Sequence, residues 1–398
     1  MEHAGVHREF QLPASSLDQG TERFETPQMF AGIVCMGYLE AFVAQVDTAN
    51  HVAVFARLLP RALHCRRRAR STQQHQRTHE DTTHAHAAQH TGYDRLRVRA
   101  TFLHPRYWPT WLGIGFLRLF EPLPQSLLYL LGRGLGGFIF LFPTPFKRIA
   151  RRNIELALPD LDAAQRAAIL REHFAGLGCA LFETAISWWS SNERIRRITL
   201  MTGLEHLKAA QATGRGVLLL SAHFNSIEIG CRALAARLPL NVMYRPTKNL
   251  LIGEFVHSRR AVQTRRAIPR DDVRTLIKAL KDGDVVWYAP DQSFRKKGAE
   301  MVTLFGIPAA TNTATSRIAR MTNALVLPYF FERLPGGGYR GVIHPPLENF
   351  PTDDPLADTE RFNRIVEAEV RRMPAQYLWI HRRFKGLTPD YPDYYAGA

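Results

Sequence analysis

The sequence predicts an α/β fold in which helices cover both faces of a central, mostly parallel sheet. Short, strongly apolar runs alternate with stretches that carry apolar residues at helical spacing, a pattern typical of such sheets. Hydrophobic residues make up 45% and aromatic residues 10% of the 398 residues, which is enough for a core and excludes a generally disordered chain. Four scattered cysteines without a CxxC pair exclude a disulfide scaffold and a zinc ribbon, and they favour a reducing compartment.

The alternation runs through residues 146–390, which we assign to one α/β domain. Residues 161–190 show helical spacing, and Asp160 or Asp162 is a suitable N-cap for that helix. The sequence shows no internal repeat. We expect strands at 217–221, 240–245, 284–290, 324–330 and 339–346, and further helices near 226–237, 271–282, 311–322 and 357–372.

Basic charge is concentrated after residue 92. Residues 1–92 contain nine arginines and nine acidic residues, whereas the remainder contains 43 basic and 27 acidic residues and carries the whole net charge of +16. Such a charge predicts an anionic partner, which can be a nucleic acid, an acidic protein or a phosphate-bearing membrane surface. Composition does not choose among the three.

Residues 1–92 differ in composition from the rest of the chain. Nine of the sixteen histidines lie there, and segment 64–92 has almost no apolar residues. We predict an extension that is largely disordered and not needed for function. Residues 32–59 are moderately apolar, but they lack the basic start and compact apolar run of a secretory signal. A metal-binding histidine tract is the alternative, but a flexible segment does not preorganise ligands.

Residues 103–145 form a candidate membrane-anchoring segment. Tyr107, Trp108 and Trp111 open it, as aromatic residues often do at a membrane interface. Charges at Arg118 and Glu121, followed by two prolines, divide the apolar run, so neither half supplies the roughly 20 apolar residues of a spanning helix. We expect an N-terminal membrane-anchoring helix, either as one imperfect span near 108–131 or as two interfacial segments. The remaining alternative is an apolar helical hairpin packed on the domain.

A histidine follows the first buried strand of the predicted sheet. The strand 217–221 ends just before His223, at the sheet edge where α/β folds present functional groups. Asn225 or Ser226 can cap the next helix, and Glu228 would then lie in its first turns. A carboxylate bonded to one ring nitrogen fixes the tautomer and raises the basicity of the other. The pattern His-x4-Glu therefore predicts a general base acting on a substrate hydroxyl.

Two more strands place polar residues at the same edge. Arg245 follows the strand 240–245, where a guanidinium can clamp a phosphate. Asp291 follows the strand 284–290. Because parallel strands end together, these residues and His223 describe one polar cleft.

With these blocks in view, the chain resembles the late acyltransferases of lipid A biosynthesis, in the lauroyl or palmitoleoyl branch of the lysophospholipid-acyltransferase-like superfamily. The similarity runs over about 290 of the 398 residues and has no counterpart in residues 1–92. It is carried by LHPRYWPTWLGIGF (103–116), RRNIELALPDL (151–161), the His-x4-Glu block, MYRP (243–246), IKALKDGDVVWYAPDQ (277–292), LFGIPAATNTATSRIARM (304–321) and QYLWIHRRFK (376–385).

The resemblance implies a glycerolipid-acyltransferase-like fold, with residues 146–390 as the acyltransferase domain. It also implies transfer of an acyl chain from acyl carrier protein to a hydroxyacyl chain of Kdo-lipid IVA. The reaction would take place at the cytoplasmic side of the bacterial inner membrane, in contact with its lipids, without a metal or diffusible cofactor. His223 would be the base, Glu228 its orienting carboxylate and Asp291 a further catalytic acid. Substrate binding falls to Arg245, Asn225, Arg295 and Lys296.

One departure from the family pattern concerns substrate detail. Relatives often carry a second polar or acidic residue and a glycine just after the PDQ-like block, where this chain has Ser293 and Arg295. Two basic clusters are candidates for contact with the carrier protein or the lipid acceptor. They comprise Arg259, Arg260, Arg265, Arg266 and Arg270, and then Arg295, Lys296 and Lys297.

The closing motif and a tryptophan pair are better explained by packing. In HRRFK (381–385) we expect Phe384, with Trp379 before it, to pack, and Arg382 and Arg383 to be exposed. Trp188 and Trp189 are expected in the core or on a membrane-facing surface rather than on an acyl pocket wall.

Three other functions remain open at this point. One is a phospholipid-type acyltransferase acting on a lysophosphatidate, which the closing motif and the MYRP block oppose. Another is a catalytically inactive lipid- or carrier-binding relative, which the complete set of polar residues opposes. The third is nucleic-acid binding, for which no module is visible; the expected partners therefore include no nucleic acid.

Overall fold

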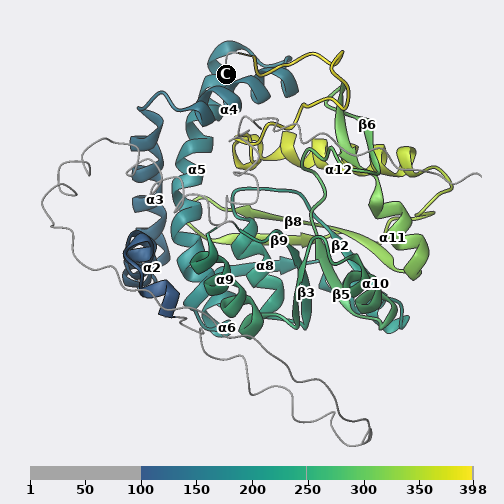
Figure 1. Ribbon diagram of the computed structural model, residues 1–398, viewed down its shortest axis with the longest axis horizontal. Coiled ribbons are helices and arrows are strands. Elements are labelled where there is room, and N and C mark those ends of the chain that lie inside the picture. Colours follow the sequence, from purple (N-terminus) through teal and green to yellow (C-terminus); the bar gives the residue numbers. More distant parts are fainter. Residues whose placement is uncertain (1–99, 248, 397–398) are drawn as a thin grey trace, which may run out of the picture.

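A seven-stranded, mostly parallel sheet forms the centre of the molecule, as the sequence predicted. The computed structural model describes residues 100–247 and 249–396 (Figure 1), so the predictions for residues 1–92 lie outside the described residues. Strand order is β1-β9-β8-β2-β5-β3-β4. The five strands from β8 to β4 are mutually parallel, β9 is antiparallel to β8, and β1 is parallel to β9. The strands are β1 (Thr199–Thr202), β2 (Val217–Leu220), β3 (Leu240–Tyr244), β4 (Arg266–Pro269), β5 (Val285–Tyr288), β8 (Leu325–Arg333) and β9 (Tyr339–Ile343).

All five expected strands are present in this sheet, which also contains two strands that were not predicted. β1 and β4 are four residues long and lie at the two edges of the sheet. Each has only one buried residue. Short edge strands lack the continuous apolar run by which a central strand such as β2 is recognised. That is why only the central strands and β9 were visible in the sequence.

Helices cover both faces of the sheet, which confirms the predicted layering (Figure 1). Leu218 and Leu220 of β2 pack into one core, whereas Val217 and Leu219 pack into the other. The first core takes side chains from α4 (Pro145–Ala157), α10 (Val273–Lys281), α11 (Ala314–Thr322) and α12 (Pro355–Arg372). The second takes them from α6 (Asn192–Ile198), α7 (Leu204–Ala212) and α8 (Ile227–Ala235). The long helix α5 (Ala163–Trp189) contributes to both, and Asp162 caps it in a capping box with Gln165.

A two-stranded antiparallel hairpin, which the sequence analysis did not predict, precedes α11. β6 (Ala299–Leu304) pairs with β7 (Ile307–Asn312). Both turn residues, Phe305 and Gly306, have positive φ angles of 52° and 73°, as a two-residue hairpin turn requires. The helix α9 (Leu250–Gln263), between β3 and β4, was also not predicted.

The apolar segment before the domain forms two helices, so the single span near 108–131 is wrong. α2 (Trp108–Phe120) and α3 (Gln125–Phe140) are separated at the point where Pro122 and Pro124 interrupt the run. α3 runs alongside α5 (Figure 1). The approach is close because Gly132 and Gly136 of α3 face Cys179 and Phe174 of α5, and a Cβ on either glycine would collide with that backbone.

No individual helix of the described chain combines the length and the apolar composition needed to cross a membrane. One pair, α3 with α4, meets both criteria jointly but bends by 95° between its helices. α2, α3 and the residues next to them nevertheless expose large apolar side chains. These are Trp108, Leu112, Phe116 and Leu119 of α2, Leu127, Leu130, Leu131 and Phe138 of α3, Leu103 before α2, and Leu141 and Phe142 after α3.

Candidate active site

The register of two neighbouring parallel strands brings His223 and Asp291 together. Leu220 at the end of β2 is paired with Tyr288 at the end of β5, and His223 and Asp291 each follow three residues later. Both chains therefore leave the sheet at the same level. The predicted cleft at the carboxyl edge is confirmed for this pair.

The Asp291 carboxylate contacts both the ring and the backbone N–H of His223. His223 Nδ1 lies 2.5 Å from Asp291 Oδ1, and the His223 backbone N–H donates to Oδ2 at 3.0 Å. A carboxylate only accepts hydrogen bonds, so the ring proton is on Nδ1 and Nε2 carries the free lone pair. Asp291 is 3% exposed, whereas the His223 side chain is 21% exposed. The carboxylate is thus enclosed, and the ring reaches the surface of a cavity.

The charge of Asp291 is maintained by its neighbours. Burial alone would raise the pKa of this carboxyl group, but the charge and hydrogen bonds of His223, together with the charge of Arg383, hold its pKa below the usual value. The carboxylate is therefore ionised and available to stabilise an imidazolium.

The structure pairs Glu228 with Arg260 rather than with the imidazole, so the predicted contact between His223 and Glu228 is not observed. Glu228 lies in the first turn of α8, as expected, but its Oε2 accepts a hydrogen bond from Arg260 Nη2 at 2.9 Å. Asp291, which the sequence analysis treated as a further acid, occupies Nδ1 instead. The physical reason is the β2–β5 register, which places His223 and Asp291 next to each other, three positions beyond paired strand ends. Glu228 lies in the following helix α8, where its side chain meets Arg260 instead.

A cavity of about 640 Å³ opens in front of His223. Its walls come from the ends of β2, β3 and β5 and from α8, α9, α10 and α11. One part of the lining is apolar, including Ile227, Met243, Val273, Ile277, Ile318 and Met321. Among the described residues, the lining also carries six cations and two carboxylates: Arg245, Arg260, Arg270, Lys296, Lys297 and Arg317, with Glu228 and Asp271. The volume and the mixed lining suit an amphipathic, anionic substrate.

The predicted substrate-binding residues separate into two groups. Arg245 and Lys296 line the cavity beside His223. Asn225 does not, because it is 2% exposed and its side chain donates to the Ala375 carbonyl at 3.3 Å. Arg295 is exposed outside the lining. The Asn225 side chain thus contacts the segment after α12 and does not reach the cavity.

The C-terminal segment contributes side chains that the sequence analysis did not place at the site. Tyr377, His381 and Arg383 line the small space behind the pair, next to His223 and Asp291. The Tyr377 hydroxyl donates to Asp291 Oδ2 at 3.2 Å. Arg383 is 3% exposed, so its predicted exposure is wrong, while the packing of Trp379 and Phe384 is confirmed. The QYLWIHRRFK motif signalled this segment, but its polar residues were interpreted as surface.

Two further expectations concern residues away from the pair. Trp188 is buried against Phe255, with ring centroids 5.1 Å apart, and Trp189 is partly buried beside it. The core alternative is therefore confirmed for Trp188, and neither tryptophan lines the cavity. Over residues 100–247 and 249–396, no group of three or more histidine, cysteine or acidic side chains has an arrangement that could hold a metal ion.

Comparison with known proteins agrees with this geometry. Residues 97–386 match the family model described as bacterial lipid A biosynthesis acyltransferase. The chain belongs to the bacterial lipid A biosynthesis acyltransferase family. His223, Asp291 and the closing segment all lie within the matched residues, so the pair is the candidate active site of an acyltransferase.

Individual relatives in the family match most of their own length. The chain is 39% identical to the lipid A biosynthesis lauroyltransferase of Escherichia coli K12 over 301 residues, which are 75% of this chain and 98% of that protein. It is 40% identical to the palmitoleoyltransferase of the same strain over 296 residues, 74% and 96% of the two chains. A lipid A biosynthesis acyltransferase of Haemophilus influenzae is 34% identical over 294 residues, 73% and 94% of the two chains. These matches favour the lipid A pathway over the phospholipid-type alternative.

Proposed function

We propose that the protein transfers a fatty acyl chain, lauroyl or similar, from acyl carrier protein to the hydroxyl of a hydroxyacyl chain on Kdo-lipid IVA. The observation that carries the proposal is the His223–Asp291 pair at the wall of a 640 Å³ cavity lined by apolar and cationic residues. An acyl chain suits the apolar part of the lining, and the phosphates and carboxylates of the acceptor suit the cations.

His223 acts as the base in this proposal. Nε2 takes the proton of the acceptor hydroxyl as its oxygen attacks the thioester carbonyl, and Asp291 stabilises the imidazolium that forms. When the tetrahedral intermediate collapses, the C–S bond breaks and the same proton passes from Nε2 to the thiolate. The products are an ester on the lipid and the free thiol of the carrier protein, so atoms and charge balance without a further reactant.

The experiment is transfer of radiolabelled acyl groups from a panel of acyl carrier protein thioesters to Kdo-lipid IVA. It compares membranes that contain the wild-type protein with membranes that contain His223→Ala. Transfer by the wild type alone supports the reaction and the base together. Absence of transfer with every donor, from folded protein, contradicts the proposal. Lysophosphatidate as acceptor in parallel distinguishes the phospholipid-type activity.

We further propose that α2 and α3 place the enzyme on the cytoplasmic surface of the inner membrane. Leu112 and Leu119 of α2 and Leu130 of α3 are each about two-thirds or more exposed, and an apolar face of this kind binds at a bilayer interface. The net charge of +16 adds attraction to anionic lipids.

Vesicle sedimentation tests the membrane proposal. The double variant Leu112→Glu, Leu119→Glu should lose most binding to anionic phospholipid vesicles. The matched control is Leu200→Glu, which adds a charge at an exposed leucine of β1 and should retain more binding than the double variant. Equal binding by all three proteins would contradict the assignment of this face.

A further inference from the structure

The chain segment that follows α12 is built into the back of the active site. Leu378 N–H donates to the His223 carbonyl at 3.0 Å, and Asn225 N–H donates to the Gln376 carbonyl at 2.7 Å. Phe224 and Tyr377 form an antiparallel bridge between these two bonds. His223 and Asn225, on either side of Phe224, are therefore both hydrogen-bonded to residues 374–384, which we call the closing segment.

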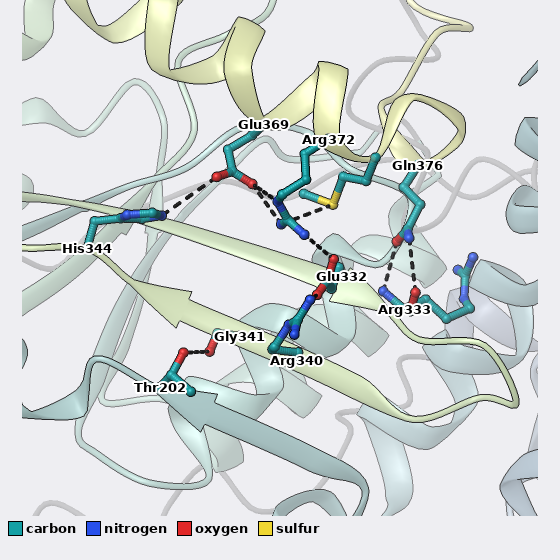
Figure 2. Close-up of polar contacts among 10 residues, drawn as sticks. Thr202, Glu332, Arg333, Arg340, Gly341, His344, Glu369, Arg372 and Gln376 are labelled. Atoms are coloured by element: carbon teal, nitrogen blue, oxygen red, sulfur yellow. Dashed lines mark hydrogen bonds and ion pairs between the residues drawn. The ribbon is translucent and has the colours of Figure 1, made fainter.

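The closing segment is itself fixed at both ends. The Gln376 side chain accepts from the Arg333 N–H at 2.8 Å and donates to its carbonyl at 3.0 Å, which attaches the segment to β8 (Figure 2). Asn153 of α4 donates to the Trp379 and His381 carbonyls at 2.5 and 2.7 Å. The segment is thus hydrogen-bonded to the sheet and to α4 as well as to the loop that carries His223.

Two side chains of the closing segment act on Asp291. Tyr377 donates its hydroxyl proton to Oδ2, the oxygen that also accepts the His223 backbone N–H. Arg383 is buried beside the carboxylate, with its guanidinium fixed on the Ala310 carbonyl and on Thr311 Oγ1 at 3.3 and 2.8 Å. A carboxylate with several donors and a nearby cation is held ionised and in one orientation.

We propose that Tyr377 and Arg383 are positioning residues for the transferase reaction: they fix the orientation and the ionised state of Asp291, which in turn orients His223. The inference rests on the proposed function only in that His223 is the base. It assigns a role in turnover to residues that touch neither donor nor acceptor.

Several other charged and titratable groups face the pair. His381 on the same side is a partly exposed ring, whose pKa is lowered to about 3, chiefly because little solvent surrounds it, and its Nε2 accepts the Ser293 N–H at 3.1 Å. On the cavity side the groups are Glu228, Arg245, Arg260, Arg270, Asp271, Lys296, Lys297 and Arg317. A change at Tyr377 alters the hydroxyl that contacts Asp291 and leaves all of these in place.

The test is Tyr377→Phe, which removes one hydroxyl and keeps the ring. Its matched control is Tyr329→Phe, because the Tyr329 hydroxyl is equally buried and donates to the Gly230 carbonyl at 2.9 Å, away from Asp291. We expect kcat of Tyr377→Phe to fall about tenfold with KM little changed. The acidic limb of the kcat/KM–pH profile should move to higher pH, because an Asp291 carboxylate with one donor fewer stabilises the imidazolium more strongly and the His223–Asp291 pair keeps its proton longer.

Arg383→Gln should move the acidic limb in the same direction and further, since it removes a charge. Should Arg383→Gln not fold, Tyr377→Phe still decides the matter. A folded Tyr377→Phe enzyme with the rate and pH profile of Tyr329→Phe would overturn the proposal. That result is distinct from failure of the proposed function, in which the wild type itself transfers no acyl group, or His223→Ala remains active.

Discussion

Behind His223 the protein is closed by buried side chains, one of which is hydrogen-bonded to the ring, whereas in front of His223 a cavity opens that is lined by apolar and charged groups. The rear contains Asp291, Tyr377 and Arg383, each buried and each held by short polar contacts. The front is a 640 Å³ cavity where apolar surface lies next to six cations of the described chain. On the proposed mechanism, the orientation of the base depends on a few buried contacts, whereas substrate recognition is spread over many separate side chains.

The largest effect is expected from the residue between the two sides. His223→Ala removes the base and should lower acyl transfer by about 10²–10⁴-fold, while the protein stays folded because the ring is partly exposed. Transfer assays with circular dichroism as the folding control check this. Turnover near the wild-type level in His223→Ala would remove the histidine from the mechanism.

Two histidines with strongly lowered pKa values should make the stability of the protein sensitive to acid. His173 of α5 is buried against the Ala375 carbonyl, with Nδ1 3.2 Å away, and burial lowers its pKa to about 3. The pKa of His381 is also about 3. Between about pH 6.5 and 3 these rings gain a proton only when the chain unfolds, so stability must fall as pH falls.

Urea unfolding at several pH values measures this dependence. His173→Gln removes one of the two rings, so the slope of unfolding free energy against pH between about 4 and 6 should decrease by about 1.4 kcal/mol per pH unit. An unchanged slope would show that His173 is protonated in the folded protein, which would contradict its burial as a neutral ring.

The front should respond with smaller effects that fall on substrate use. Arg245→Ala removes one cation of the lining and should raise KM about tenfold, with kcat less affected. The control is Arg295→Ala, whose guanidinium is exposed outside the lining, and it should change KM by no more than about twofold. Equal KM values for the two variants would remove Arg245 from the binding surface.

The smallest effect is expected from deleting residues 1–92. The family match begins at residue 97, and every residue of the two sides of His223 lies within it. Specific activity of the truncated enzyme, measured at equal protein concentration, should equal that of the full chain. A large loss would show that the interpretation of these residues as a non-essential extension is wrong.

Much of the fold could be predicted from the sequence because the central strands are continuous apolar runs. β2, β3, β5 and β8 are buried on both faces, and such runs are recognisable without tertiary information. The edge strands β1 and β4 are short and partly exposed. The turn of the β6–β7 hairpin is Phe305–Gly306, a dipeptide that does not by itself indicate a hairpin. These elements depend on their neighbours more than on their own pattern.

The sequence predicted which strand ends carry the polar residues of the site, but not which side chains contact one another. His223, Arg245 and Asp291 follow predicted strands, and their shared edge follows from parallel topology. Which carboxylate reaches the imidazole depends on the β2–β5 register, and proximity in sequence favoured Glu228 instead. Tyr377 and Arg383 come from more than 80 positions beyond Asp291, so only the folded chain shows their contact with it.

The central claim is that Asp291, and not Glu228, orients the base. The most direct test measures kcat for acyl transfer by Asp291→Asn and Glu228→Gln, two changes that each convert a carboxylate into an amide of the same shape. Asp291→Asn should lose about 10²–10⁴-fold because the wrong tautomer of His223 is then favoured. Glu228→Gln should lose about tenfold or less, through its contact with Arg260. A larger loss in Glu228→Gln than in Asp291→Asn would contradict this account of the active site.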